Sequence, residues 1–240
     1  KGLGKHVDEI PFRELTVTLV RDVLPEGLFK SVVASGGAQM GVDMFVKRLE
    51  GFKAALEDYN KDNGTSAEIV AEDAGFPGTD GAFEASQASS LDKDYDAVAS
   101  LYNIAVYFQP LIEKEKMDGS VKLATLGVVD ESYQSFVESG SIISILYENE
   151  EFTFGNAIPM ILNALEGQKM TNEDGSALQL QVGYWNVNSP EMFNAIYNKH
   201  SSGEYYVTAQ DVAGFMVHYN DKVTADDLSS FYESLSIDVE

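Results

Sequence analysis

The segment from Leu28 to Tyr59 constrains the fold more than any other part of the sequence. It begins with an apolar, β-rich run, Phe29 to Ala34, and continues into a turn that contains three glycines. An amphipathic stretch follows and ends in the letters RLEGFKAAL. This order of β-rich run, tight turn and amphipathic stretch is typical of a strand covered by the helix that follows it.

The same order of strand and helix recurs along the chain. Alternation of strands with helices is typical of an α/β fold with a parallel sheet. The sequence therefore predicts a three-layer α/β/α sandwich with a mostly parallel sheet. The predicted strands are 15–19, 30–34, 68–71, 96–101, 121–129, 141–147 and 178–187, and the predicted helices are 42–59, 79–91, 105–116, 131–139 and 152–166.

The last fifty residues have a different pattern. Ser189 followed by Pro190 is typical of a helix start, and Thr208 and Thr224 also have the character of helix caps. The sequence therefore predicts a helical C-terminal extension over 189–240. Its predicted helices are 190–199, 209–218 and 225–235, with a short strand at 206–208.

Charge and composition argue against several classes of partner. The 240 residues carry a net charge of −23. Such a surface repels phosphates, which argues against nucleic acid and anionic membranes. The chain has no Cys, which excludes disulfides, thiolate zinc sites and Cys nucleophiles. It also has no apolar run of about 18 residues that would span a membrane.

The motifs that usually mark catalysis are absent from the sequence. The glycine turn at 35–41 is followed by Val42 and Asp43, where a phosphate-binding loop needs Lys and Ser or Thr. The stretch 58–64 resembles the start of a calcium loop. However, Asn63 and Ile69 stand at the sixth and twelfth positions, where such a loop needs Gly and Glu. The three His have no metal-ligand spacing, and no G-x-S-x-G occurs. We therefore predict no enzyme activity, no cofactor and no metal site.

Aromatic side chains fall where three of the predicted strands end. These residues are Phe76, Tyr102 and Tyr147. In open α/β sheets ligands bind beyond the carboxyl ends of the strands, and an aromatic ring there can cover the apolar face of a sugar. The alternative is that the rings pack in the core or at its rim. The sequence leaves both interpretations open.

Several motifs resemble a known family. They are Arg48-Leu-Glu-Gly-Phe-Lys-Ala-Ala-Leu after the strand at 30–34, which is the first of the strand–helix series, Asp96 to Asn103, Val121 to Asp130, Ser135 to Ser141, and the late helix Phe152 to Gly167. In order and spacing they resemble the C-terminal lobe of type I solute-binding proteins, the ribose- and galactose-binding group. The same fold serves as the effector domain of lactose-repressor-like regulators. The resemblance covers about residues 28–188.

The resemblance implies a set of ligand-binding residues. Arg48 matches an arginine that bonds sugar hydroxyls, and Phe76 matches a stacking aromatic. Asn103, or Tyr102 with a register shift of one, matches a ligand-binding asparagine. Asp130 lies near the family's aspartate at the end of the fourth strand. Tyr147 begins the stretch that matches a polar ligand residue after the fifth.

The chain also departs from the family pattern. The family's G-F-D-G is replaced by Leu126-Gly-Val-Val-Asp130, which puts the sugar specificity in doubt. Only residues 1–28 precede the domain at 29–188, so we expect the family's other lobe to be missing from this sequence. Residues 1–28 are either an entry segment or a remnant of that lobe. Pairing of two chains as a homodimer stays open as a way to complete the site.

The resemblance implies binding of a small polar ligand, most simply a sugar, as part of an ABC-transporter solute-binding protein. Its partner would then be a membrane permease, and its location extracytoplasmic, periplasmic or as a cell-surface lipoprotein. The first residues, KGLGKHVDEIPF, are not a signal peptide, so we expect a targeting segment to have been removed or to lie upstream. The alternatives are the effector or sensor domain of a regulator with the same fold and, less favoured, a flavodoxin-like enzyme.

Overall fold

The computed structural model describes residues 31–35, 43–73, 95–103, 121–172, 174–176, 178, 180 and 184–235. The chain forms two compact units. The first contains residues up to Tyr147 together with Asn186–Phe193, and the second contains Glu148–Trp185 together with Asn194–Glu240. The domain boundaries expected at 28 and 188 stay predictions, and the division into units falls at other positions.

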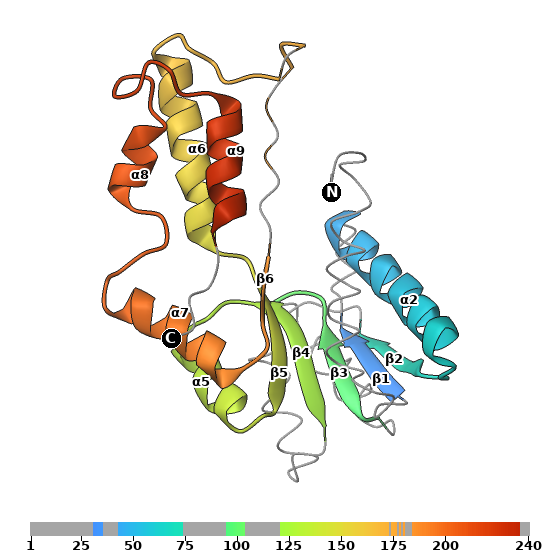
Figure 1. Ribbon diagram of the computed structural model, residues 1–240. Coiled ribbons are helices and arrows are strands. Elements are labelled where there is room, and N and C mark those ends of the chain that lie inside the picture. The colour runs from blue at the N-terminus through green and yellow to red at the C-terminus, as the bar shows by residue number, and fades with distance from the viewer. Residues whose placement is uncertain are drawn as a thin grey trace, which may run out of the picture. The chain divides into compact units, whose positions relative to one another are not determined.

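A parallel sheet forms the centre of the first unit (Figure 1). Its described strands lie in the order β2-β1-β3-β4-β5-β6, and the four pairings from β2 to β5 are parallel. This arrangement confirms the predicted α/β fold with a mostly parallel sheet. The strands are β1 (Ser31–Ser35), β2 (Glu68–Asp73), β3 (Ala97–Ser100), β4 (Lys122–Gly127), β5 (Ile142–Tyr147) and β6 (Trp185–Val187).

The central strands are buried on both faces, as continuous apolar runs in a parallel sheet require. All four residues of β3 are buried, and so are the middle four residues of β4. Small side chains such as Ala97, Ala99 and Ala124 leave room for the covering layers, and each of them is fully buried. The core of the first unit therefore lies around β3, β4 and β5.

Two described helices belong to the first unit. Helix α2 (Asp43–Asn63) buries Phe52, Ala55 and Leu56 on one face, which matches its amphipathic pattern. Helix α5 (Glu131–Glu138) buries Tyr133 and Val137. The predicted strand 15–19 and the predicted helices 79–91 and 105–116 lie outside the described residues.

Helices dominate the second unit, where α6 (Glu150–Leu165), α8 (Ala209–Gly214) and α9 (Ala225–Ser234) lie together (Figure 1). Its core contains Phe152, Val207, Leu228 and Tyr232. The ring of Phe152 meets the rings of Trp185 and Tyr232 edge to face. Helix α7 (Pro190–Ser201) begins in the first unit and ends in the second.

One face of α6 carries exposed apolar side chains. Phe154 is 61% exposed, Ile161 59% and Leu165 78%, and their spacing places them on one side of the helix. Contiguous apolar surface of this kind is common where proteins meet partners. Pairing of two chains as a homodimer stays open, because no partner chain is described.

Three expected elements differ from the structure. Residues 178, 180 and 184 are not in a strand, so among the described residues β6 covers only the end of the predicted 178–187. Residues 206–208 form no strand, because the Val207 N–H donates to the Glu151 carboxylate. Helix α8 ends at Gly214 rather than at 218, because Asn163 accepts the Val217 N–H and donates to the Phe215 carbonyl.

Both predicted threonine caps are confirmed. Thr208 and Thr224 each form a capping box, in which the threonine hydroxyl accepts the backbone N–H of the third helical residue and that residue's carboxylate accepts the threonine N–H. The partners are Asp211 and Asp227. Each box therefore satisfies two backbone donors that the helix start would leave open.

Replacing Thr224 with alanine is expected to lower the free energy of unfolding by about 1 kcal/mol. The change removes the hydroxyl that accepts the Asp227 N–H at 3.2 Å. Urea unfolding followed by circular dichroism measures the loss. The matched control is Ser230→Ala on the exposed side of the same helix, where alanine is expected to be neutral or slightly stabilising. Equal effects of the two variants would contradict the cap.

The same cap predicts a pH dependence. Hydrogen bonds from the Thr224 side chain, and next from its backbone, lower the pKa of Asp227 below its ordinary value of 3.8. The folded state therefore favours the ionised carboxylate, so this stabilisation is present above the ordinary pKa and lost as the pH falls through the lowered folded value. The stability difference between wild type and Thr224→Ala should shrink when unfolding is measured at progressively lower pH in this acidic range. A difference that grows would contradict the assignment.

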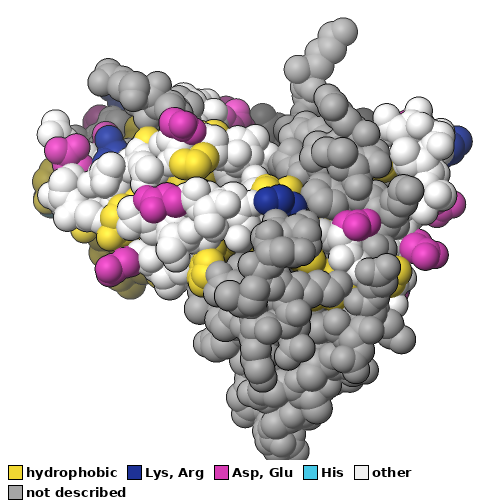
Figure 2. Space-filling view, turned by 90° about the horizontal axis from the view of Figure 1, so that it is seen from below, with side chains coloured by type: hydrophobic (Ala, Val, Ile, Leu, Met, Phe, Trp, Pro, Cys, Tyr) yellow, Lys and Arg dark blue, Asp and Glu magenta, His cyan; other side chains and the backbone are white. Residues whose placement is uncertain are grey.

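In the view of Figure 2, acidic side chains are scattered over the described surface with uncharged side chains between them. This distribution accords with the net charge of −23. Within the described ranges, no helix is both long enough and apolar enough to cross a membrane.

Candidate ligand-binding site

The carboxyl ends of β3, β4 and β5 lie along one edge of the sheet, because these strands are parallel and adjacent. The register pairs Ser100 with Thr125 and Gly127 with Tyr147. We call this edge, made of residues 101–103, 127–130 and 147, the strand-end edge. It is the place where open α/β sheets bind ligands.

Arg48 of α2 is buried and contacts the strand-end edge at Leu101. The side chain is only 9% exposed, and its guanidinium donates a hydrogen bond of 3.1 Å to the Leu101 carbonyl. The Arg48 Cζ lies 5.8 Å from the centre of the Phe45 ring. At this distance the electrons of a ring face attract a cation. Arg48 therefore ties α2 to the end of β3, and its predicted contact with a ligand stays a prediction.

Tyr102 anchors the chain as it leaves β3. Its ring is 6% exposed and packs edge-on against the ring of Phe45 at 5.5 Å. Its carbonyl accepts hydrogen bonds from the hydroxyls of Ser100 and Thr125, at 2.6 Å and 3.3 Å. These bonds fix the backbone immediately before Asn103.

Asn103 is exposed and held from one side. Its Oδ1 accepts a hydrogen bond from the hydroxyl of Tyr133, a residue of α5 whose side chain is fully buried. Among the described residues, the Asn103 Nδ2 has no protein partner. The amide therefore offers its N–H groups at the strand-end edge.

Gly127, the last residue of β4, lies beneath this pair. A Cβ at Gly127 would lie 3.0 Å from the Tyr133 hydroxyl oxygen and 3.4 Å from the Asn103 Oδ1. The distance to Asn103 is an ordinary contact, but the distance to Tyr133 is tight, so a side chain at this position would require the Tyr133 hydroxyl to shift by a few tenths of an ångström.

Asp130 follows β4 and caps α5. Its Oδ1 accepts the backbone N–H of Ser132 at 2.8 Å and also the Ser132 hydroxyl. The side chain is exposed, and within the described part of the chain its Oδ2 has no protein partner. One carboxylate oxygen therefore has a structural role, and the other can accept a hydrogen bond from outside the protein.

The remaining predicted site residues differ in position. Tyr147 ends β5 and pairs with Gly127 across the sheet, and its side chain is 6% exposed. Phe76 lies outside the described residues. The structure thus places Arg48, Tyr102, Asn103, Asp130 and Tyr147 at or next to the strand-end edge.

Tyr133, Gly127 and Phe45 complete this edge but were not predicted from the sequence. Tyr133 and Phe45 lie on helices that follow β4 and β1, at positions where an aromatic residue is expected to pack in the core. The hydroxyl of Tyr133 donates to Asn103, and the ring of Phe45 lies beside the Tyr102 ring and the Arg48 guanidinium. No sequence signal distinguishes such a tyrosine from an ordinary core residue.

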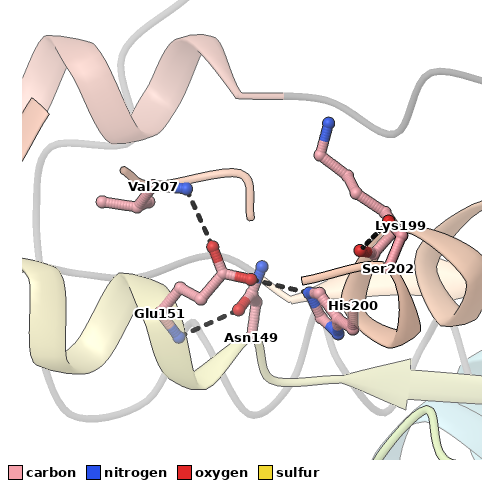
Figure 3. Close-up of polar contacts among 6 residues, drawn as sticks. All are labelled: Asn149, Glu151, Lys199, His200, Ser202 and Val207. Atoms are coloured by element: carbon pink, nitrogen blue, oxygen red, sulfur yellow. Dashed lines mark hydrogen bonds and ion pairs between the residues drawn. The ribbon is translucent and has the colours of Figure 1, made fainter. Parts of the chain in front are cut away.

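A second polar cluster lies within the second unit, at the start of α6 (Figure 3). The Glu151 carboxylate lies 2.6 Å from the His200 Nε2, and its other oxygen accepts the Val207 N–H at 2.8 Å. Asn149 caps the helix, because its Oδ1 accepts the Glu151 N–H at 2.9 Å. Glu151 therefore joins the first turn of α6 to the last turn of α7 and to the segment before α8.

Within the described ranges, no three side chains of His, Cys, Asp or Glu gather as they do around a metal ion. In the second unit, burial and then the charges of Asp211 and Glu151 raise the pKa of Tyr232 to about 12. Its hydroxyl therefore stays neutral at ordinary pH.

Comparison with known proteins places the fold. No protein-family model and no curated protein sequence matches the chain. Among solved structures, it is similar to a periplasmic solute-binding protein of an ABC transporter from Actinobacillus succinogenes with bound D-allose. The identity is 17%, the TM-score 0.56, and the match covers 76% of this chain and 59% of that protein.

Two further structures are similar to the same degree. One is a substrate-binding protein of a sugar ABC transport system from Bordetella parapertussis, with 14% identity, a TM-score of 0.55 and coverage of 74% of this chain and 54% of that one. The other is described as a LacI transcriptional regulator from Bacteroides fragilis, with 10% identity, a TM-score of 0.55 and coverage of 76% and 61%.

The chain spans 54% to 61% of the length of these three proteins. They are binding proteins and a regulator rather than enzymes. At such low identity the likeness carries information on the fold alone. The chain has the α/β fold of a periplasmic-binding-protein lobe.

Proposed function

We propose that the strand-end edge binds a small polar ligand of the sugar class. The observation that carries this proposal is the exposed Asn103 amide, whose oxygen is held by a buried tyrosine at the carboxyl end of a parallel strand. The free oxygen of Asp130 adds an acceptor on the neighbouring strand end. Donors and acceptors of this kind match the hydroxyl groups of a sugar.

We further propose that the chain acts as part of an ABC-transporter solute-binding protein, outside the cytoplasm and with a membrane permease as partner. The support is the fold shared with the Actinobacillus and Bordetella proteins, one of which carries bound D-allose. The proposed ligand contacts are Arg48, Phe76, Tyr102, Asn103, Asp130 and Tyr147.

The effector domain of a transcriptional regulator is the second candidate. The similarity to the Bacteroides protein supports it at the same TM-score. The gene region upstream of the Lys1 codon separates the two candidates. A signal sequence with a lipidated cysteine would favour transport, and a helix-turn-helix would favour the regulator.

Titration calorimetry with D-allose, D-ribose, D-galactose and D-glucose tests the binding function. At least one sugar is expected to bind, and Asn103→Ala is expected to weaken that binding roughly five- to tenfold, which corresponds to one lost hydrogen bond. The matched control is Asn63→Ala, which changes an exposed asparagine whose amide bonds the Tyr59 carbonyl at the far end of α2. Absence of binding by every sugar, or equal weakening by both variants, would contradict the proposal.

A further inference from the structure

A buried tyrosine next to the strand-end edge donates its hydroxyl to an exposed residue of that edge. The Tyr133 side chain is fully buried, yet its hydroxyl reaches the exposed Asn103 and donates to the Oδ1. We infer that Tyr133 is a positioning residue, which holds the Asn103 amide so that its Nδ2 is presented to the ligand. This inference rests on the proposed binding function and specifies the chemistry of its ligand.

The reason lies in the freedom of an asparagine side chain. The terminal torsion of asparagine is broad and roughly two-fold, so an unrestrained amide presents its oxygen or its nitrogen with similar ease. In the structure the Tyr133 hydroxyl donates to the Oδ1, and this bond holds the amide with its Nδ2 turned away from the tyrosine. The Nδ2 then offers its two N–H donors on that side.

Gly127, at the end of β4, lies next to both Tyr133 and Asn103. The space above its Cα is occupied by the Tyr133 hydroxyl and the Asn103 Oδ1, at 3.0 Å and 3.4 Å from a Cβ position. The glycine thus allows the hydroxyl to lie over the end of β4. Tyr133 on α5 and Gly127 at the end of β4 thus together set the orientation of the Asn103 side-chain amide.

This geometry restricts the ligand. A ligand atom bound to the Asn103 Nδ2 must be a hydrogen-bond acceptor, such as a hydroxyl, ring or carbonyl oxygen, because the Nδ2 can only donate. An ammonium group is excluded from the Nδ2, since it has donors and no acceptor. A ligand that uses this donor therefore carries an oxygen acceptor, as a sugar does.

A double-mutant cycle tests whether Tyr133 acts through Asn103. Calorimetry with the same four sugars compares wild type, Tyr133→Phe, N103A and the double variant. Tyr133→Phe is expected to weaken binding roughly three- to tenfold in the wild-type background and to have no further effect in the N103A background. An equal loss in both backgrounds would mean that the hydroxyl supports only the fold, which overturns the inference.

The matched control is Tyr95→Phe, which removes a hydroxyl from another buried tyrosine, before the start of β3 and at the opposite end of that strand. It is expected to leave binding unchanged. Gly127→Ala offers a second route, because it keeps both side chains and crowds the pair from below. If Tyr133→Phe does not fold, Gly127→Ala is expected to weaken binding in the wild-type background alone, and an unchanged affinity would overturn the inference.

A ligand-free measurement separates the inference from the proposed function. In nuclear magnetic resonance spectra of the ¹⁵N-labelled chain, the Asn103 side-chain amide is identified by its loss in N103A. Its signals are expected to show contacts with the Tyr133 ring and to shift in Tyr133→Phe. If no sugar binds but these signals behave as expected, the sugar function fails and the positioning survives. If they are unchanged in Tyr133→Phe, the positioning is wrong whether or not a sugar binds.

Discussion

Replacing Arg48 with methionine is expected to lower the free energy of unfolding by roughly 2–3 kcal/mol. The guanidinium is buried and donates to the Leu101 carbonyl. Methionine has no donor, so the Leu101 carbonyl loses this hydrogen bond. The change also removes the cation beside the Phe45 ring. Urea unfolding measured by tryptophan fluorescence and circular dichroism gives the value.

The neighbouring Lys47 provides the control for this experiment. It is exposed, and Lys47→Met removes the same charge from the same helix, so its effect should stay within about 0.5 kcal/mol. A loss of less than about 1 kcal/mol in Arg48→Met would contradict the role of Arg48 in tying α2 to β3. The affinity of the folded variant for a sugar then tests separately whether Arg48 also contacts ligand.

Replacing Gly155 with alanine is expected to destabilise the second unit by about 2–3 kcal/mol, although alanine is the better helix former by about 1 kcal/mol. A Cβ at Gly155 would lie 2.2 Å from the hydroxyl oxygen of Tyr232 and 3.0 Å from a methyl group of Val207. The ring that carries this hydroxyl is itself buried and packs on Phe152, so it cannot move aside at low cost.

Tyr232→Phe supplies the rescue. The Tyr232 hydroxyl is buried and has no hydrogen-bond partner among the described residues, so its removal alone should be neutral or slightly stabilising. In the double variant the closest remaining ring carbon lies 3.3 Å from the new Cβ, and most of the lost stability should return. Thermal unfolding of the four proteins checks this cycle. Additive effects of the two changes would contradict the steric account.

Much of the fold follows from the sequence because its signals are local. The strands β1 to β5 begin and end within two residues of the predicted apolar runs, and the caps at Thr208 and Thr224 depend on residues three positions apart. The end of α8 was not predictable, because Asn163 takes the Val217 N–H from fifty-four positions away. The pairing of Glu151 with His200 was missed for the same reason.

The candidate site was only partly predictable for a related physical reason. The rule that ligands meet the carboxyl ends of parallel strands directs attention to Tyr102, Asn103 and Tyr147, which end or follow adjacent strands. The rule does not reveal which helix residue reaches over that edge. Tyr133 has the sequence pattern of a core residue, and only the packing of α5 shows that its hydroxyl meets Asn103.

A nuclear magnetic resonance titration tests the central claim, ligand binding at the strand-end edge, most directly. The ¹⁵N-labelled chain is titrated with D-allose, D-ribose, D-galactose and D-glucose in turn, and the amide shifts are mapped on the sequence. For at least one sugar, the largest shifts are expected at Asn103, Gly127 and Asp130. Absence of shifts with every sugar, or shifts confined to residues away from this edge, would contradict the account.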